Sequence, residues 1–520
     1  MFESLRAQVL ARERNYPELI ELAQTYLAEK TDVTALQDLG NVLLSNGLNS
    51  QAAQLFKKAY ELDPKHLSSL VGFANSVKDI LHQEEALRVY RFLHDQLPEN
   101  LLIWRNLLLA MEYASIVTDQ ERFEYAKRWG ESQLKRTGDQ QTLDRTVSIT
   151  DIPLRVGYLS ADLCQHTVGL FLRGLLKAHT SKIKAYAYHL SHLTDGITNE
   201  IAQVSVLRNC GHMSDEDLIE QIRSDRLDVL IDLSGHTAGS RLHLLARRLA
   251  PVQLSWLGYF ATTGLSNLEG IVLDAWHVNE ENQAHFTEPV ICLESGRLCY
   301  QPIEFAPAVL AAPVQRNGFI TFGSFNNTAK YNLEVLQLWA EILKQVPKSR
   351  LVLKWRTFHD PVFCSRVLQI FEDFGIDSSR LDLRGFSTHD QMLAEYADID
   401  IALDPFPFSG GLTSCEALWM GVPVITMPQS RAVSRQTYAF SAAIGGLENL
   451  IARNPEDYLL LATRWARDSA QLKNFRLQIR EKMSASPLMN INSFAAEFEE
   501  MLLRQLAQKI EKTTKKIQKN

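Results

Sequence analysis

Cysteine is scarce in this chain of 520 residues, and the six that occur are scattered without any CxxC spacing. That pattern argues against a disulfide framework or a zinc site and favours a reducing compartment. A run of about 18 apolar residues is also missing, so we expect no membrane span. The first residues lack the pattern of a signal peptide. Together these absences predict a cytoplasmic protein.

The chain has no excess of basic residues either. Its formal net charge is -7, so nothing indicates a general nucleic-acid binder. Hydrophobic residues make up 46% and charged residues 22%, which are ordinary globular values that exclude wholesale disorder. The length corresponds to about three domains. We expect residues 504–520, which are rich in lysine, to form a solvated tail.

A helical repeat occupies the first part of the chain. The prolines Pro64 and Pro98 lie 34 residues apart, and so do the alanines Ala52 and Ala86. This is the period of a tetratricopeptide repeat, in which small residues let two helices pack closely and proline ends the second helix. We therefore predict an all-α tetratricopeptide array over residues 1–135, which buries its core between neighbouring helical hairpins.

After a polar linker at residues 136–153, short β-rich runs alternate with helical stretches, which predicts parallel α/β sheets. The expected strands of the first lobe, residues 154–312, are Leu154–Ser160, Ile183–Leu190, Leu227–Leu233, Val252–Leu257 and Gly270–Leu273. Those of the second lobe, residues 313–503, are Phe319–Phe325, Leu351–Trp355, Leu381–Arg384, Ile399–Leu403 and Pro423–Met427. We predict two doubly wound lobes, with ligands beyond the carboxyl ends of the strands.

The most informative segment follows the expected strand Ile399–Leu403. A turn ends in Gly410 and Gly411, and a short helix then begins near Thr413. Thr413 and Glu416 have the spacing of a capping box. Free amides and the helix dipole make such a place an anion site, and the two glycines let a diphosphate approach the backbone.

Several segments carry a resemblance to a known family. They are Arg155–Asp162 with His166, Gly235-His236-Thr237, Ala250–Tyr259, Phe322–Lys330, Leu403–Pro407 and Gly421–Met427. In order and content, they resemble the O-linked N-acetylglucosamine transferase and SPINDLY-like glycosyltransferases, and the SPINDLY-like branch is the nearer. The resemblance runs from about Leu154 to Leu503. It implies the GT-B fold, with two Rossmann-like lobes, and an inverting transfer of a sugar to a protein hydroxyl without a metal cofactor.

The resemblance also implies roles for individual residues. Lys330 matches the lysine at the donor diphosphate, where a compact positive charge stabilises the leaving group. Asn327 lies beside it near the nucleotide, and Glu416 matches the acidic residue at the ribose hydroxyls. The phosphate-binding loop corresponds to Gly410, Gly411, Leu412, Thr413 and Ser414. His166 matches the histidine at the sugar and acceptor, with a pKa range suited to proton transfer, although no residue is assigned as the general base.

His236 has two interpretations, a wall of the active site or a structural histidine. The sequence also departs from the family pattern. Gly411 stands where N-acetylglucosamine transferases carry a histidine, and Met392 falls where another family histidine contacts the base, with His389 one turn away. The turn at Phe260 lacks the usual proline.

Four functions therefore stay open. The leading one is transfer of N-acetylglucosamine from its UDP donor to protein Ser/Thr hydroxyls, with the tetratricopeptide face offering a site for the acceptor protein or peptide. The others are protein O-fucosylation from GDP-fucose, an asparagine-directed hexosyltransferase, and a tetratricopeptide adaptor with degenerate lobes. No nucleic-acid or membrane partner is expected.

Overall fold

The computed structural model describes residues 2–138 and 153–517, so most of the predicted linker 136–153 lies outside the described residues. The chain divides into two compact units. Unit 1 comprises Met1–Val117, Glu304–Gln429 and Asn449–Arg480, and unit 2 comprises Thr118–Ile303, Ser430–Glu448 and Glu481–Asn520. Each unit contains one parallel sheet.

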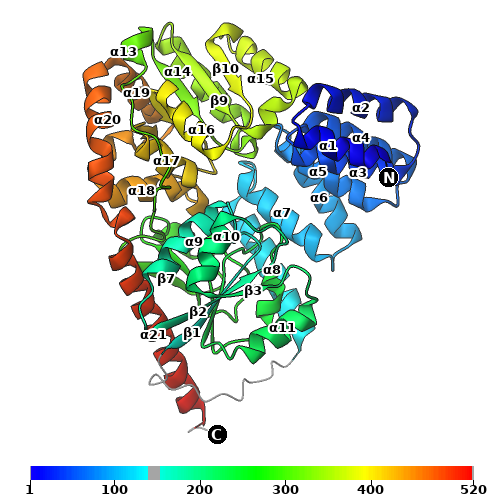
Figure 1. Cartoon of the computed structure of the whole chain (residues 1–520), viewed down its shortest axis with the longest axis vertical. Helices are drawn as coiled ribbons and strands as arrows, with labels where there is room; N and C mark the ends of the chain where they lie inside the picture. Colours follow the sequence, from blue (N-terminus) through cyan, green and yellow to red (C-terminus); the bar gives the residue numbers. More distant parts are fainter. Residues whose placement is uncertain (1, 139–152, 518–520) are drawn as a thin grey trace. The chain divides into compact units, whose positions relative to one another are not determined.

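The N-terminal segment forms an array of helices, drawn from dark blue to cyan in Figure 1. Its members in unit 1 are α1 (Phe2–Arg12), α2 (Tyr16–Glu29), α3 (Val33–Ser45), α4 (Asn49–Leu62), α5 (Leu67–Lys78), α6 (Gln83–Gln96) and α7 (Leu101–Tyr113). A Cβ atom built on Gly40 or Gly72 would come within 2.8 or 2.5 Å of the Phe56 ring. Small residues therefore allow this ring to fill the space between hairpins. The next helix, α8 (Asp119–Thr137), belongs to unit 2.

Unit 2 contains a seven-stranded parallel sheet with the order β3-β2-β1-β4-β5-β6-β7. Its strands are β1 (Leu154–Ser160), β2 (Ile183–His189), β3 (Val206–Asn209), β4 (Val229–Asp232), β5 (Val252–Ser255), β6 (Gly270–Asp274) and β7 (Val290–Leu293). Its helices include α9 (Thr167–Ala178), α10 (Gly196–Val204), α11 (Asp215–Ser224), α12 (Glu280–Gln283), α18 (Gln436–Ile444) and α21 (Ile491–Ile517). The order reverses between β1 and β4, as in a doubly wound fold.

Unit 1 contains a five-stranded parallel sheet with the order β10-β9-β8-β11-β12. Its strands are β8 (Thr321–Ser324), β9 (Arg350–Lys354), β10 (Leu381–Arg384), β11 (Ile401–Leu403) and β12 (Val424–Ile425). The accompanying helices are α13 (Val314–Asn317), α14 (Leu333–Gln345), α15 (Pro361–Asp373), α16 (His389–Glu395), α17 (Leu412–Trp419) and α19 (Pro455–Arg467). Here the order reverses between β8 and β11. The prediction of two doubly wound lobes preceded by a helical array is confirmed.

Some elements differ from the sequence prediction. The strands β3 and β7 were not predicted, and they lie at the two edges of the larger sheet. Helix α20 (Ser469–Ser484) crosses from unit 1 into unit 2. Helix α21 continues to Ile517, so most of the segment predicted as a tail is helical. Among the residues that the structure describes, no helix combines the length and apolar character needed to cross a membrane.

Candidate functional site

The predicted site residues follow the two strands at which each sheet reverses its order. In unit 1, Lys330 follows β8, and the loop through Gly410 follows β11. In unit 2, His166 follows β1, and His236 follows β4. This is the position at which doubly wound sheets bind their ligands, because the connections on the two sides diverge and leave a crevice at the strand ends.

Lys330 ends a short 3-10 helix, η2 (Thr328–Lys330), directly after β8. Its Nζ donates to Asn326 Oδ1 at 3.1 Å and to the Ser409 carbonyl at 2.9 Å, and it lies 4.9 Å from the centre of the Phe408 ring. Burial lowers the pKa of Lys330 to about 8, and the nearby Asp404 carboxylate partly offsets this effect. Lys330 is therefore a half-buried cation that titrates near pH 8.

The loop after β11 is organised around the buried carboxylate of Asp404. Its Oδ1 accepts from the Gly410 amide at 2.6 Å, and its Oδ2 accepts from the Thr426 hydroxyl at 2.7 Å. A Cβ atom on Gly410 would lie 2.1 Å from Ser414 Oγ. A larger residue at this position would displace the Ser414 hydroxyl, so glycine suits the close approach of this loop to the first turn of α17.

Helix α17 begins two residues earlier than predicted. Gly411 is its N-cap and Leu412 its first residue, so the predicted capping box, with Thr413 as N-cap, is wrong. The hydroxyl of Thr413 instead donates to Asn326 Oδ1 at 3.2 Å. The first turn of the helix thus lies beside the side chains that contact Lys330, and its backbone amides bring partial positive charge to the same place.

The two neighbouring asparagines after β8 have different contacts. Asn327 accepts from the Ala329 amide at 3.0 Å and caps η2. Asn326 is buried, and its Oδ1 accepts hydrogen bonds from both Lys330 and Thr413. Sequence reasoning singled out Asn327 and missed Asn326, because adjacent identical side chains give no signal of which one points inward.

Glu416 lies in the middle of α17 and is 3% exposed. Its Oε1 is 2.5 Å from Nε2 of His389, the first residue of α16. Burial raises the pKa of Glu416, and the hydrogen bond and charge of His389 partly offset that rise. With Oε1 held by His389, the other carboxylate oxygen can accept hydrogen bonds from a ligand. His389, one turn from Met392, is thus the residue of α16 that contacts the predicted ribose-binding carboxylate.

In unit 2, His166 is the N-cap of α9, and half of its side chain is exposed. Its Nδ1 accepts from the Val168 amide at 3.4 Å and lies 3.8 Å from Asp162 Oδ2. Burial raises the pKa of Asp162, and His166 opposes that rise. A histidine with Nδ1 directed to its own backbone presents Nε2 outward, which is the geometry required for hydrogen bonding or proton transfer to a ligand.

His236 has a different environment, since only 2% of its surface is exposed. Its Nε2 lies 2.9 Å from the Thr263 carbonyl, and its ring packs edge-on against Trp129 of α8 and Tyr259. Of the two interpretations that the sequence left open, these contacts favour the structural one. His236 connects the end of β4 to α8.

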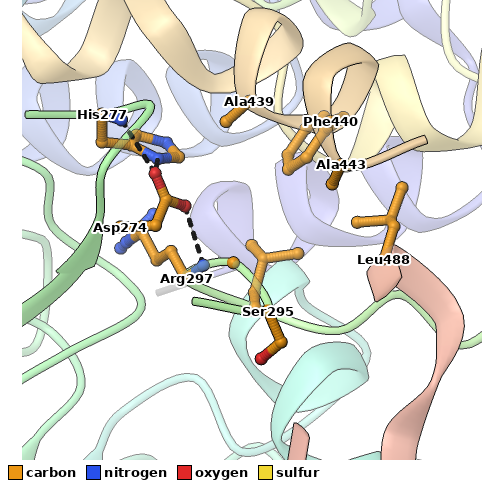
Figure 2. A pocket seen from close by; sticks show the side chains of 10 residues that line it. Asp274, His277, Ser295, Arg297, Ala439, Phe440, Ala443 and Leu488 are labelled. Atoms are coloured by element: carbon orange, nitrogen blue, oxygen red, sulfur yellow. Dashed lines mark hydrogen bonds and ion pairs between the residues drawn. The ribbon is translucent and has the colours of Figure 1, made fainter. Parts of the chain in front are cut away.

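Unit 2 also contains a small pocket that holds none of the predicted site residues (Figure 2). Its free volume is about 210 Å³, including its opening to solvent. Asp274 accepts from His277 Nδ1 and from the Arg297 amide, each at 2.8 Å, and Phe440 and Leu488 lie across from them. Although burial raises the pKa of Asp274, His277 and the amides lower it to about 2. This charged cluster joins the end of β6 to the chain at Arg297.

Comparisons with known proteins agree with this architecture. The model of the family described as Glycosyl transferase family 41 matches residues 88–297 and 314–498. A protein of Solanum lycopersicum named "Probable UDP-N-acetylglucosamine--peptide N-acetylglucosaminyltransferase SPINDLY" is 36% identical over 410 residues, which are 77% of this chain and 44% of the relative. The protein of the same name from Arabidopsis thaliana is 35% identical over 411 residues, with the same two shares.

A solved structure matches almost the whole chain. It is a lysine-to-methionine mutant of the O-GlcNAc transferase of Thermobaculum terrenum, with 29% identity, a TM-score of 0.88 and coverage of 98% of both chains. The curated plant relatives are longer, and this chain spans less than half of their length. The family model covers both sheets and most of the residues described above. The chain therefore belongs to glycosyl transferase family 41.

Proposed function

We propose that this protein transfers N-acetylglucosamine from UDP-N-acetylglucosamine to serine and threonine hydroxyls of proteins. The observation that carries the proposal is the cluster of Lys330, the N-terminus of α17 and Glu416 at the reversal point of the unit 1 sheet. These groups supply a cation, the positive end of a helix dipole and a carboxylate acceptor, which match a diphosphate and a ribose. The names of the relatives, which specify UDP-N-acetylglucosamine and peptide, support the donor and acceptor.

In the proposed reaction, the acceptor hydroxyl oxygen attacks the anomeric carbon of the sugar. The bond between that carbon and the diphosphate oxygen breaks with inversion, and UDP leaves with the electron pair. Lys330 and the amides of α17 stabilise the charge that develops on the leaving diphosphate, so no metal ion is required in this proposal. The acceptor's proton passes to a base that we leave unassigned, and His166 stays a prediction for the sugar and acceptor side.

We further propose that the helical array contributes to acceptor binding. Stacked helical hairpins present an extended surface on which a polypeptide can lie.

A calorimetric and thermal-shift panel of UDP, GDP, UDP-N-acetylglucosamine, UDP-glucose and GDP-fucose tests the donor. We expect UDP and UDP-N-acetylglucosamine to bind and to raise the unfolding temperature, because a ligand selective for the folded state stabilises it by mass action. Excess EDTA should leave this binding unchanged. Selective binding of GDP and GDP-fucose would replace the proposal by fucosyl transfer, and no response to any compound would favour an adaptor.

UDP affinity is also expected to depend on pH. Lys330 carries its charge below its pKa of about 8 and loses it as the pH rises through that value. Affinity should therefore be constant from pH 7 to 7.5 and about tenfold weaker at pH 9, since each pH unit above the pKa removes a factor of ten in the charged fraction. Calorimetry across this range measures the profile, and a Lys330→Gln variant should give a flat one. A wild-type profile without this alkaline decline would show that Lys330 does not pair with the diphosphate.

A further inference from the structure

Two side chains of the helical array contact the segment that carries Lys330. The first is Gln83, the first residue of α6. Its Nε2 donates to the Ala329 carbonyl at 3.2 Å and to the Tyr331 carbonyl at 2.5 Å. These carbonyls belong to the residues on either side of Lys330. One side chain of the array thus holds the backbone on both sides of the predicted diphosphate-binding lysine.

The second side chain is Tyr113, the last residue of α7. Its ring stacks on Phe408, with 4.6 Å between ring centres and an angle of 12° between ring planes. Phe408 is the ring over which the Lys330 ammonium lies, and the next residue, Ser409, accepts a hydrogen bond from that ammonium through its carbonyl. Tyr113 therefore supports the loop that forms one side of the lysine's environment.

The array is joined firmly to this lobe at a third place. The amide of Ser50, in the first turn of α4, donates to Asp360 Oδ2 at 2.6 Å, while Oδ1 of the same carboxylate caps α15. A Cβ atom on Gly47 would fall 2.4 Å from the Arg356 carbonyl oxygen. Backbone thus packs directly on backbone at this contact. These contacts hold the array in place, so the helices that carry Gln83 and Tyr113 are also fixed against the segment around Lys330.

We propose that Gln83 and Tyr113 are positioning residues, which hold Lys330 in the orientation that the donor diphosphate requires. The inference rests on the proposed function, because it concerns the same diphosphate site. Lysine has a long and flexible side chain, so its charge acts at one point only when its backbone and its surroundings are fixed. In η2 the backbone makes only a short 3-10 turn, and Gln83 supplies the additional restraint from outside the lobe.

A double-mutant cycle separates positioning from a merely structural role. Gln83→Met removes the side-chain amide that donates both hydrogen bonds but keeps a side chain of similar size. Tyr113→Leu removes the stacked ring, whereas Tyr113→Phe keeps it. Each change is made alone and together with Lys330→Ala. The readouts are kcat and KM for transfer from UDP-N-acetylglucosamine to a serine-containing peptide, UDP affinity by calorimetry, and the unfolding temperature. Gln54→Met and Tyr60→Leu, two changes on α4, serve as matched controls.

We expect Gln83→Met and Tyr113→Leu each to lower kcat about five- to thirtyfold, the scale of a displaced charge-stabilising group. The kcat values of Tyr113→Phe and of both controls should lie within about twofold of the wild-type value, and we treat a difference of that size as no effect. In the Lys330→Ala background, the same two substitutions should have almost no further effect, because the group through which they act is gone. The peptide KM should stay unchanged.

Two results would overturn the inference. If the losses multiply in the Lys330→Ala background, the two residues act independently of Lys330 and serve only to attach the array. If the single variants have the kcat of wild type, Gln83 and Tyr113 do not position Lys330. Both results leave wild-type UDP binding and transfer intact, and so differ from a failure of the proposed function, in which wild-type protein itself neither binds UDP nor transfers the sugar.

Discussion

Replacing Lys330 with alanine is expected to lower turnover about 10²-fold or more while the protein stays folded. The ammonium and the Thr413 hydroxyl of α17 both donate to Asn326 Oδ1, and the loss of one main charge-stabilising donor in an active site has an effect on this scale. Steady-state kinetics with UDP-N-acetylglucosamine and a protein acceptor measures the change. Release of UDP in the absence of acceptor should fall in parallel, because the leaving group is the same.

A matched control lies on the neighbouring helix. Lys344, near the end of α14, pairs with Glu341 at the surface, and its ammonium lies 2.7 Å from Glu341 Oε1. Exposed ion pairs of this kind contribute little, so Lys344→Ala should leave turnover and stability within experimental scatter. Wild-type turnover in a Lys330→Ala preparation would refute the assignment of this residue to the diphosphate.

Replacing Glu416 with glutamine is expected to weaken UDP binding about tenfold to a hundredfold. A carboxylate that accepts from ribose hydroxyls forms charge-assisted hydrogen bonds, and such bonds contribute about 1.5–3 kcal/mol each. Glutamine keeps the size of the side chain but removes the charge and one acceptor. Calorimetric titration with UDP measures the loss, and Glu372→Gln on the exposed surface of α15 provides the control.

Deoxyribose analogues make this test specific. Wild-type protein should bind 2′-deoxy- or 3′-deoxy-UDP more weakly than UDP, whereas Glu416→Gln should discriminate little between them. Equal discrimination by the two proteins would mean that Glu416 does not contact the ribose. In that case its pair with His389, at 2.5 Å, would serve only to connect α16 to α17.

Much of the fold could be predicted because its strong signals are local. The buried strands β1, β2, β8 and β9 read as apolar runs bounded by polar turns, and the predictions agree with the observed bounds within a few residues. The edge strand β3, with the sequence Val-Leu-Arg-Asn, is half exposed, and β7 is short. β3 lacks the apolar continuity that identifies a strand. β7 is continuously apolar but so short that periodicity cannot separate a strand from a helix, so both were missed.

The candidate site was predictable only in part, for a related reason. Glycines before a helix and a lysine after a strand stand out in the chain, and the structure brings Lys330 and the Gly410 loop together. The partner of Glu416 was not predictable, since His389 lies 27 residues away and meets it only through the fold. The same holds for Gln83, which is 246 residues from the carbonyl of Ala329. Contacts of this kind have no signature in a local pattern.

The division of the helical array between the two units has a consequence for protein engineering. Helices α1–α7 belong to the same unit as the five-stranded sheet, and α8 belongs to the unit of the seven-stranded sheet, so the boundary falls between Val117 and Thr118. A chimera that exchanges the whole array for that of another family member would therefore replace Gln83 and Tyr113 along with the proposed acceptor surface. Any altered specificity in such a chimera would be confounded with altered catalysis. Grafts that stop before Gly47, and so keep Ser50, Gln83 and Tyr113, would exchange the first helices while leaving the contacts around Lys330 native.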